Sequence, residues 1–325
     1  MTEDIRSEVF WPYDSILNKV DGPCGVEVAD RALPEGTMWI ATPKFHGVNT
    51  CVTVWVKSKT VRFGRRNGYL KPKESHYDVL NVVGKYEWSS LCQLFPAADS
   101  VVVYGELYGG VFGKGGGQGA VQKEVHYDPK RAFVGFDILV NNKFLSFYDT
   151  KEVLRKLRVP CVPVLARGTA KEMLGWARAH ADDPAFLMRK DLRVQELGGK
   201  PNTGEGWVIR PVMEQAQSDG SRMLFKVKSA HFDETPAVTR APGPVSSKKD
   251  AGTVSSVEVP QLRVASVLSK EPSESIVIGN LQTLTQRVLD DVLKDFPGLA
   301  SEKEMNQKLL RGACFQAVKL YLSKK

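Results

Sequence analysis

The apolar positions of the chain follow two different periods, and the change between them divides it into parts. From about Met38 to Phe232, short runs of β-branched and aromatic residues alternate with glycine-rich turns. Runs of this length and composition predict the strands of an antiparallel sheet. The expected strands are Thr50–Val56, Thr60–Phe63, Val101–Leu107, Ala132–Val140, Gly206–Arg210 and Met223–Lys228.

Two stretches inside this region have helical spacing instead. The first runs from Asp149 to Leu157, with Thr150 as its candidate cap, and the second runs from Ala170 to His180. Residues three and four apart lie on one face of a helix. On the first stretch, the apolar residues that share such a face are Val153, Leu154 and Leu157.

A break follows from Thr235 to Ser256, where proline, glycine, serine and lysine dominate. We expect a linker there, because so little apolar surface cannot offset the entropy lost on ordering. Helical periodicity then returns after a candidate cap at Asn280, and Ser301 with Glu304 forms the pattern of a capping box. The apolar positions concerned are Leu281, Leu284, Val288, Val292, Phe296, Met305, Leu309 and Ala313.

These patterns together predict an α+β fold, in which antiparallel sheets with flanking helices precede a small helical domain. The expected parts are a first domain at residues 1–240, a flexible linker at 241–258 and a helical domain at 259–325.

The composition is that of a globular protein, with 42% hydrophobic and 25% charged residues among 325. No apolar run approaches the roughly 18 residues of a membrane-spanning helix, and the acidic N-terminal residues differ from a secretory or transit signal. We therefore expect an intracellular protein, cytoplasmic or nuclear, with no membrane partner. The five cysteines are scattered and form no C-x-x-C pair, which predicts reduced, structural thiols and no zinc site.

The formal net charge of +8 favours a polyanionic partner. Clustered lysines and arginines gain free energy by releasing counterions from phosphate backbones. Charge alone leaves two interpretations open, a nucleic-acid-binding protein and a basic enzyme without such a partner.

Candidate chemistry begins with Lys44, which stands three residues before Gly47 and just ahead of the apolar run that starts at Cys51. Taken alone, a lysine at this spacing is more typical of a solvated turn than of a nucleophile. The basic turn from Arg62 to Gly68, which contains Arg66, is equally typical of a solvated hairpin tip.

Two glutamates, Glu106 and Glu205, are flanked by glycines at the end and the start of apolar strands. Glycine lets a ligand approach the backbone closely. A half-buried carboxylate needs a partner, which leaves open a metal ion, a ribose hydroxyl and an arginine of the protein itself. The two carboxylates can also converge on one cation.

Three further residues have both a structural and a chemical interpretation. Lys226 and Lys228 alternate with apolar residues, so both lie on one face of a strand, which suits either a solvated edge or an anion site. Phe136 lies in another expected strand, where it is either a core residue or a ring that stacks on a base.

These residue types meet the needs of nucleotidyl transfer to a lysine. A lysine amine is a nucleophile only when neutral, and at an ordinary pKa near 10.4 roughly one molecule in a few thousand is neutral at pH 7. Burial, nearby cations such as Lys226 and Lys228, or a divalent metal would favour the neutral amine of Lys44. The two lysines can also neutralise an α-phosphate, while Glu106 and Glu205 can hold magnesium.

The motifs K-x-H-G-x-N, R-x-G, G-E-L-x-G, F-D-I, E-G-x-V-I and K-x-K occur in this order and resemble those of the covalent nucleotidyltransferases. The segment from Lys44 to Asn49 is similar to the bacteriophage RNA ligase 2-like branch, which includes the trypanosome RNA-editing ligases. Residues 121–129 and 13–18 also resemble that branch. The resemblance spans about Trp11 to Ser229 and implies a nucleotidyltransferase domain of the ATP-grasp-like ligase type.

The resemblance implies that Lys44 is the site of adenylylation, that His46 and Asn49 act in steps with the RNA ends, and that Phe136 stacks on adenine. Arg66 would contact the nucleotide or the 5'-phosphate. The implied nucleotide-binding residues are Lys44, Phe45, Asn49, Arg66, Glu106, Phe136, Glu205, Lys226 and Lys228, of which Glu106 and Glu205 also bind the metal and Lys226 and Lys228 also act in catalysis. Pro43 departs from the pattern, because relatives often carry an acidic residue there.

The implied activity is that of an ATP-dependent RNA ligase using Mg²⁺ or Mn²⁺. It would seal 5'-phosphate and 3'-hydroxyl ends in a nicked RNA duplex through lysyl-AMP and adenylylated RNA. A DNA ligase and a GTP-dependent capping enzyme are alternatives, although both normally lack the counterparts of His46 and Asn49. A non-catalytic nucleic-acid-binding relic of the fold is the alternative from another class.

Overall fold

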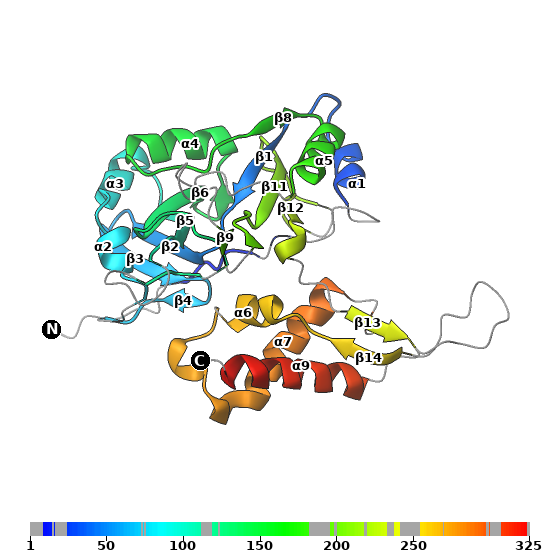
Figure 1. Cartoon of the computed structure of the whole chain (residues 1–325). Helices are drawn as coiled ribbons and strands as arrows, with labels where there is room; N and C mark the ends of the chain where they lie inside the picture. Colours follow the sequence, from blue (N-terminus) through cyan, green and yellow to red (C-terminus); the bar gives the residue numbers. More distant parts are fainter. Residues whose placement is uncertain are drawn as a thin grey trace. The chain divides into compact units, whose positions relative to one another are not determined.

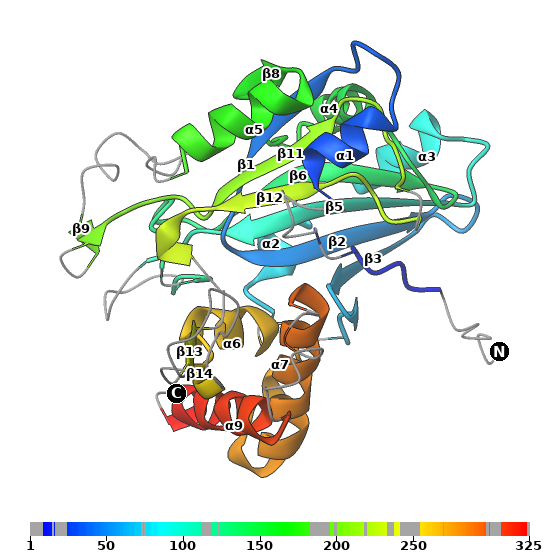
Figure 2. The ribbon, with the colours of Figure 1, turned by 90° about the vertical axis from the view of Figure 1, so that its right-hand side faces the viewer.

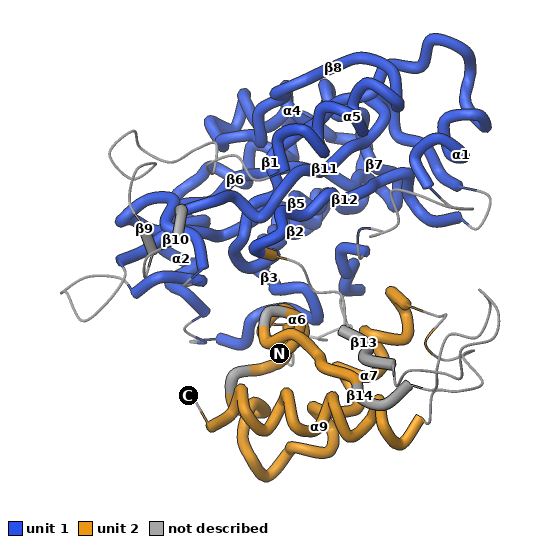
Figure 3. Tube along the Cα trace, turned by 45° about the vertical axis from the view of Figure 1, so that its right-hand side comes forward, with its two compact units in different colours: residues 1–231 blue, residues 232–325 orange. Residues whose placement is uncertain are grey.

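The computed structural model describes residues 9–14, 16, 25–72, 74, 76–111, 119–122, 124–181, 196–197, 200–217, 220–232, 237–240, 254–268, 270–296, 299 and 307–323. The chain forms two compact units, Met1–His231 and Phe232–Lys325 (Figure 3). Each unit has its own hydrophobic core.

A six-stranded sheet is the larger of two main sheets in the first unit (Figure 1). Neighbouring strands are antiparallel throughout, as the short apolar runs and glycine-rich turns of the sequence predict. In spatial order the strands are β4 (Gly68–Tyr69), β3 (Thr60–Arg65), β2 (Val48–Trp55), β5 (Ser100–Tyr108), β6 (Ala132–Val140) and β7 (Lys143–Phe144).

The second main sheet has four antiparallel strands. Their order is β12 (Phe225–Lys228), β11 (Gly206–Pro211), β1 (Trp39–Lys44) and β8 (Ala166–Gly168). A separate small pair joins β9 (Glu196–Leu197) to β10 (Lys200–Pro201).

The helices of the first unit lie beside these sheets. They are α1 (Val26–Arg31), α2 (Val79–Val82), α3 (Leu91–Leu94), α4 (Phe147–Lys156) and α5 (Ala170–Ala179), with short 3₁₀ turns at Trp88–Ser90 and Ala230–Phe232. Thr169 and Glu172 form a capping box at the start of α5. The cap expected at Thr150 is wrong, because Ser146 accepts the hydrogen bond from Asp149 and α4 begins earlier. Thr150 is buried within the helix.

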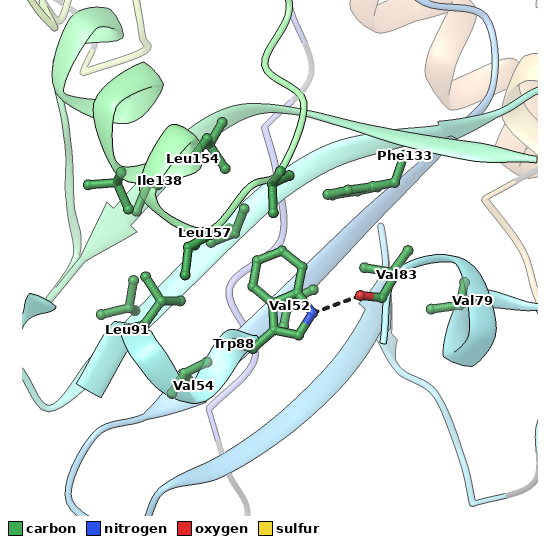
Figure 4. Close-up of a cluster of buried hydrophobic side chains, with 14 of the residues drawn as sticks. Val52, Val54, Val79, Val83, Trp88, Leu91, Phe133, Ile138, Leu154 and Leu157 are labelled. Carbon is green, nitrogen blue, oxygen red and sulfur yellow. Dashed lines mark hydrogen bonds between the residues drawn. The ribbon is translucent and has the colours of Figure 1, made fainter. Parts of the chain in front are cut away.

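Three apolar clusters hold the first unit together. The largest packs one face of the six-stranded sheet against α2, α3 and α4, and includes Trp88, whose indole N–H donates to the carbonyl of Val83 (Figure 4). A second cluster joins α1 and α5 to one face of the four-stranded sheet (Figure 2). The third contains Val208 of β11 together with Cys51, Tyr104 and Leu139 of the other sheet, so the two sheets pack face to face across it.

A register shift between β5 and β6 shapes the space between the sheets. Tyr104 pairs with Asp137 and Gly105 with Gly135, which leaves Phe136 without a partner on β5. An extra residue of this kind places two successive side chains on one side of a strand. Phe136 and Asp137 therefore both reach the third cluster, where each contacts Tyr13.

The second unit combines a hairpin with helices. Strands β13 (Ala237–Arg240) and β14 (Val254–Glu258) pair in an antiparallel manner. The helices are α6 (Gln261–Leu268), α7 (Leu281–Asp295) and α9 (Gln307–Ser323), with 3₁₀ turns at Ser273–Ser275 and Ile278–Asn280. Their core includes the helical-period positions Leu284, Val288 and Val292.

Two expectations for this region need correction. The linker expected at 241–258 ends in strand β14, because Val254–Glu258 forms backbone hydrogen bonds with β13 despite its low apolar content. Asn280 stands at the start of α7, but its side chain donates to the carbonyl of Ser275 and does not cap the helix. The expected capping box at Ser301 and Glu304 lies outside the described residues.

The expected α+β class, with antiparallel sheets, flanking helices and a helical C-terminal part, is confirmed. Cys51, Cys92, Cys161 and Cys314 are free thiols. Across the described parts of the chain, no helix combines the length and the apolar character needed to cross a membrane.

Candidate active site

Lys44 ends strand β1 opposite Gly206 of β11, and Gly206 in turn lies opposite Lys228 of β12. Side chains at directly paired positions point to the same face of a sheet. Trp207 and Ile209 of β11 belong to the cluster under α5, so the alternate positions face the other sheet. Lys44 and Lys228 therefore project into the space between the two sheets.

Glu205 is the centre of a cluster of charges in this space. Its Oε1 lies 2.7 Å from the amine of Lys44 and 3.5 Å from that of Lys228. Its Oε2 lies 3.6 Å from Nδ1 of His46. Burial alone would raise the pKa of Glu205, but Lys44, His46 and Lys228 outweigh it and hold that pKa well below its ordinary value. Glu205 is thus an anion at neutral pH.

Two glycines are required by the close packing around this cluster. Gly206 has φ +138°, and a Cβ there would lie 2.0 Å from the carbonyl oxygen of Val227. Gly47, the glycine of the K-x-x-G pattern, would place a Cβ 2.2 Å from the carbonyl oxygen of Leu107. Only glycine fits such positions without moving the strands that present Lys228 and Glu106.

Glu106 and Asn49 approach from the six-stranded sheet, where they are paired across β5 and β2. They share the face of Tyr104 and Cys51, which line the space between the sheets. Burial raises the pKa of Glu106 to about 7, Lys44 opposes this rise, and the neighbouring charge of Glu205 adds to it. Asn49 is buried, and its Oδ1 has no hydrogen-bond partner among the described residues.

This set of oxygens fits a hard divalent cation. Mg²⁺ and Mn²⁺ bind carboxylate and amide oxygens, and Mg²⁺ in particular uses few protein ligands and keeps its waters. The amide oxygen of Asn49 has no hydrogen-bond partner among the described residues, and burial keeps the pKa of Glu106 raised although Lys44, Arg66 and His46 oppose it. Among the described side chains, no three from histidine, cysteine, aspartate and glutamate gather into a closed metal site. An ion here would therefore also need water or substrate oxygens.

Arg66 and Lys226 complete the predicted set of cations. Arg66 follows the end of β3, and its charge opposes the rise in the pKa of Glu106, which places it near that carboxylate. Lys226 is on β12, where it lies opposite Val208 of β11 and alternates with the buried Phe225. The expected alternation is observed, so Lys226 and Lys228 share the face that Lys44 occupies.

The two predicted aromatic contacts have different surroundings. Phe136 is half-buried with its ring centroid 5.0 Å from that of Tyr13. The ring of Phe45 is buried, 4.8 Å from Tyr108 and 5.3 Å from Tyr127. The Phe45 side chain therefore anchors the segment after Lys44 in the core, and a ligand would meet its backbone.

The sequence interpretation missed a buried ionic network around Asp137. Its carboxylate accepts hydrogen bonds from Tyr13 at 2.5 Å, from Arg210 at 2.6 Å and from Arg222 at 3.0 and 3.1 Å. Burial raises the pKa of Asp137, but Arg210 and Arg222 outweigh it and hold it at about 2. Because Asp137 is on β6 and Arg210 on β11, the network joins the two sheets. A charged residue inside the apolar run F-V-G-F-D-I-L-V was the available signal.

The sequence interpretation also missed two residues in the segment that connects β5 to β6. Glu124 Oε2 is 2.9 Å from His46 Nε2, and Tyr127 Oη accepts a hydrogen bond from the backbone N–H of His46 at 2.9 Å. Burial lowers the pKa of His46, but Glu124 and Glu205 outweigh it and raise that pKa to about 9. Sequence similarity flagged residues 121–129, but no spacing rule connects Glu124 to His46 across 78 positions.

The geometry can support chemistry at phosphorus. It offers one amine at the end of a strand, two further lysines on the same face, an imidazole and two carboxylates. Glu205 forms ion pairs with Lys44 and Lys228, whereas burial raises the pKa of Glu106 to about 7. Fixed cations stabilise the negative charge that develops on a phosphoryl group in the transition state of its transfer. The structure brings together Lys44, His46, Asn49, Arg66, Glu106, Glu205 and Lys228 as the sequence predicts, with Lys226 on the shared face.

A family model described as RNA ligase matches residues 37–228, which is more than half of the chain. Similar solved structures include a Naegleria gruberi RNA ligase mutant with ATP and Mn, at 16% identity and a TM-score of 0.44, covering 64% of this chain and 52% of that chain. The same enzyme with PPi is 18% identical with a TM-score of 0.44, covering 71% of this chain and 61% of that chain. The chain thus spans less than two thirds of the length of these structures.

Proposed function

The chain belongs to the RNA ligase family, and on that premise we propose that it is an ATP-dependent RNA ligase in which Lys44 carries AMP. The observation that best supports this proposal is the convergence of Lys44, His46 and Lys228 on the buried carboxylate of Glu205. A nucleophilic lysine must be held in one place, and the 2.7 Å contact between the Lys44 amine and the buried carboxylate of Glu205 does this.

The reaction proceeds through three displacements at phosphorus. First, the Lys44 amine, after losing a proton, attacks the α-phosphorus of ATP, so that a P–N bond forms and pyrophosphate leaves. Next, an oxygen of the RNA 5'-phosphate attacks the same phosphorus, the P–N bond breaks, and adenylylated RNA forms. Last, the 3'-hydroxyl oxygen attacks the RNA 5'-phosphorus and AMP departs.

The protein contributes position and charge in these steps. Glu205 holds the Lys44 ammonium at 2.7 Å before reaction, which fixes the nitrogen but keeps it protonated. Lys226 and Lys228, which share one strand face, stabilise the negative charge that develops on the α-phosphate. Arg66, near Glu106, stabilises a neighbouring phosphate. Phe136 would offer its half-buried ring to adenine.

The donor set suits Mg²⁺ or Mn²⁺ held by Glu106 and Glu205 with the amide oxygen of Asn49 nearby. When bound, the ion would neutralise phosphate charge and favour the neutral form of the nucleophile. Burial raises the pKa of Glu106 to about 7, and a bound cation would favour its anionic form.

The nucleic acid we propose is RNA with a nick in a duplex. The net charge of +8 suits a phosphate backbone read by shape. DNA ligation, capping with GTP and non-catalytic binding predict different labelling or sealing, so one experiment separates them.

The test is incubation of the full-length protein with Mg²⁺ and α-labelled ATP or GTP, followed by denaturation. We expect label from ATP that is absent in Lys44→Ala and retained in Lys151→Ala, a change at an exposed lysine of α4. Label from GTP would indicate capping, and no label from a folded protein would support the binding relic. Nicked RNA and DNA duplexes then decide which ends are sealed.

A further inference from the structure

His46 is held between two carboxylates from different parts of the first unit. Its Nε2 lies 2.9 Å from Glu124 Oε2, and its Nδ1 lies 3.6 Å from Glu205 Oε2. The His46 side chain is 16% exposed and that of Glu124 28%. With both ring nitrogens facing oxygens, the imidazole has one preferred orientation.

The segment that carries Glu124 also fixes the backbone around His46. Gln122 donates to the carbonyl of Gly47 at 3.1 Å, and Tyr127 accepts from the N–H of His46 at 2.9 Å. The ring of Tyr127 packs on Phe45. These contacts hold the main chain after Lys44, whereas Glu124 is the residue of this segment that contacts the imidazole.

The same segment is tied to the strand start that bears Glu205. The side chain of Asn202 accepts from the backbone N–H of His126 at 3.0 Å and donates to its carbonyl at 3.0 Å. Asn202 precedes Glu205 by three residues. These hydrogen bonds hold the backbone around Glu124, His46 and Glu205 together. A change of the Glu124 side chain need not displace that backbone.

The balance of charge at Glu205 changes during the proposed reaction. The amine of Lys44 is the nearest basic group to Glu205, at 2.7 Å, followed by the amine of Lys228 at 3.5 Å and Nδ1 of His46 at 3.6 Å. Once the Lys44 nitrogen is bonded to phosphorus it is no longer an ammonium. Of these three, Lys228 and His46 then remain, and a buried carboxylate that loses its closest cation is strongly destabilised unless others compensate.

We infer that Glu124 is a positioning residue that holds the His46 imidazole against Glu205, and that this support is needed chiefly after Lys44 has taken AMP. The inference rests on the proposed function. Glu124 contacts the imidazole of His46. It acts through His46, and its effect falls on the transfer of AMP from Lys44 to the RNA 5'-phosphate.

The experiment separates the two steps. Lysyl-AMP formation is timed with labelled ATP, and the isolated labelled enzyme is then mixed with 5'-phosphorylated nicked RNA in a single turnover. For Glu124→Ala we expect lysyl-AMP formation within about threefold of the unmodified enzyme and AMP transfer slower by about tenfold or more, the range of one charge-assisted hydrogen bond. Glu152→Ala, a change at an exposed glutamate of α4, should alter neither step.

Glu124→Gln adds a graded readout, because it keeps an oxygen acceptor for the imidazole but loses the charge. Its transfer rate should lie between those of Glu124→Ala and the unmodified enzyme, and its near-identical shape keeps the test available if the alanine variant does not fold. Unchanged transfer, or an equal slowing of both steps, overturns the positioning role. Absence of label in the unmodified enzyme removes the proposed function and this inference with it.

Discussion

The amine of Lys44 lies 2.7 Å from the carboxylate of Glu205, which is itself buried. The ion pair fixes the nitrogen at the end of β1 but stabilises its protonated form. In the proposed reaction, Lys44 must therefore move away from Glu205, or share it with other cations, before its amine can act as a nucleophile. His46 and Lys228 also lie close to the Glu205 carboxylate, and they can stabilise its negative charge once Lys44 no longer does.

Glu205→Gln should reduce the rate of lysyl-AMP formation by about 100-fold or more, because the site loses both the group that positions Lys44 and a proposed metal ligand. The amide would also release Lys44 from an anion, which favours its neutral form, but misplacing the nucleophile outweighs that gain. Single-turnover labelling at saturating ATP measures the rate. Labelling as fast as in the unmodified protein would show that Glu205 has no part in the step.

Gly206→Ala should destabilise the first unit by about 2 kcal/mol or more, since the residue has φ +138° and its Cβ would meet the carbonyl of Val227. The displaced strands would also misplace Lys228, so labelling of Lys44 should fall. Chemical denaturation gives the free energy of unfolding.

A matched control for this change is Gly312→Ala in α9, where a Cβ would meet nothing within 4 Å. It should stabilise that helix by up to about 1 kcal/mol and leave labelling unchanged. If both variants behaved alike, the close approach at Gly206 would not be the cause.

Asp137→Asn should cost about 3 kcal/mol, because Arg210 and Arg222 would keep their buried charges without the carboxylate between them. Tyr13→Phe removes one hydrogen bond to the same carboxylate and should cost about 1 kcal/mol. Urea denaturation of the two variants tests the order. A larger loss for Tyr13→Phe would contradict the view that charge dominates this network.

The strands and the charged side of β12 could be predicted because their signals are local. Alternation around Lys226 and Lys228 gives their shared face directly. The glycines beside Glu106 and Glu205 gave a reason to expect a ligand, but pairing across sheets is needed to bring those glutamates to Lys44.

The remaining features depend on long-range geometry that no local pattern encodes. The register shift that turns both Phe136 and Asp137 inward is set by the pairing of β6 with β5. The pairing of β14 with β13 overrides the weak apolar content of Val254–Glu258. Glu124 reaches His46 only after the chain has formed β2 and β5 between them.

His76, which is buried near Arg65 at the end of β3, should make the stability of the protein depend on pH. Burial and the charge of Arg65 lower the pKa of His76 to about 4, although Glu74 opposes this, and its Nε2 is buried without a hydrogen-bond partner among the described residues. The unfolded chain takes up a proton near pH 6.5. Between pH 6.5 and about 4 the unfolded state therefore binds more protons than the folded state, so stability falls as the pH is lowered through this window.

At pH 5 the titration of His76 should lower the free energy of unfolding by about 2 kcal/mol relative to pH 7.5. This value follows because pH 5 lies about 1.5 units below the pKa of histidine in the unfolded chain. His76→Gln cannot titrate, so it should show a pH dependence smaller by that amount, whatever its stability at neutral pH. Urea denaturation of both proteins at pH 5 and 7.5 measures the difference, with His180→Gln as a control at the C-terminal end of α5. Equal pH dependence in the His76 variant and the unmodified protein would mean that His76 is not kept neutral by the fold.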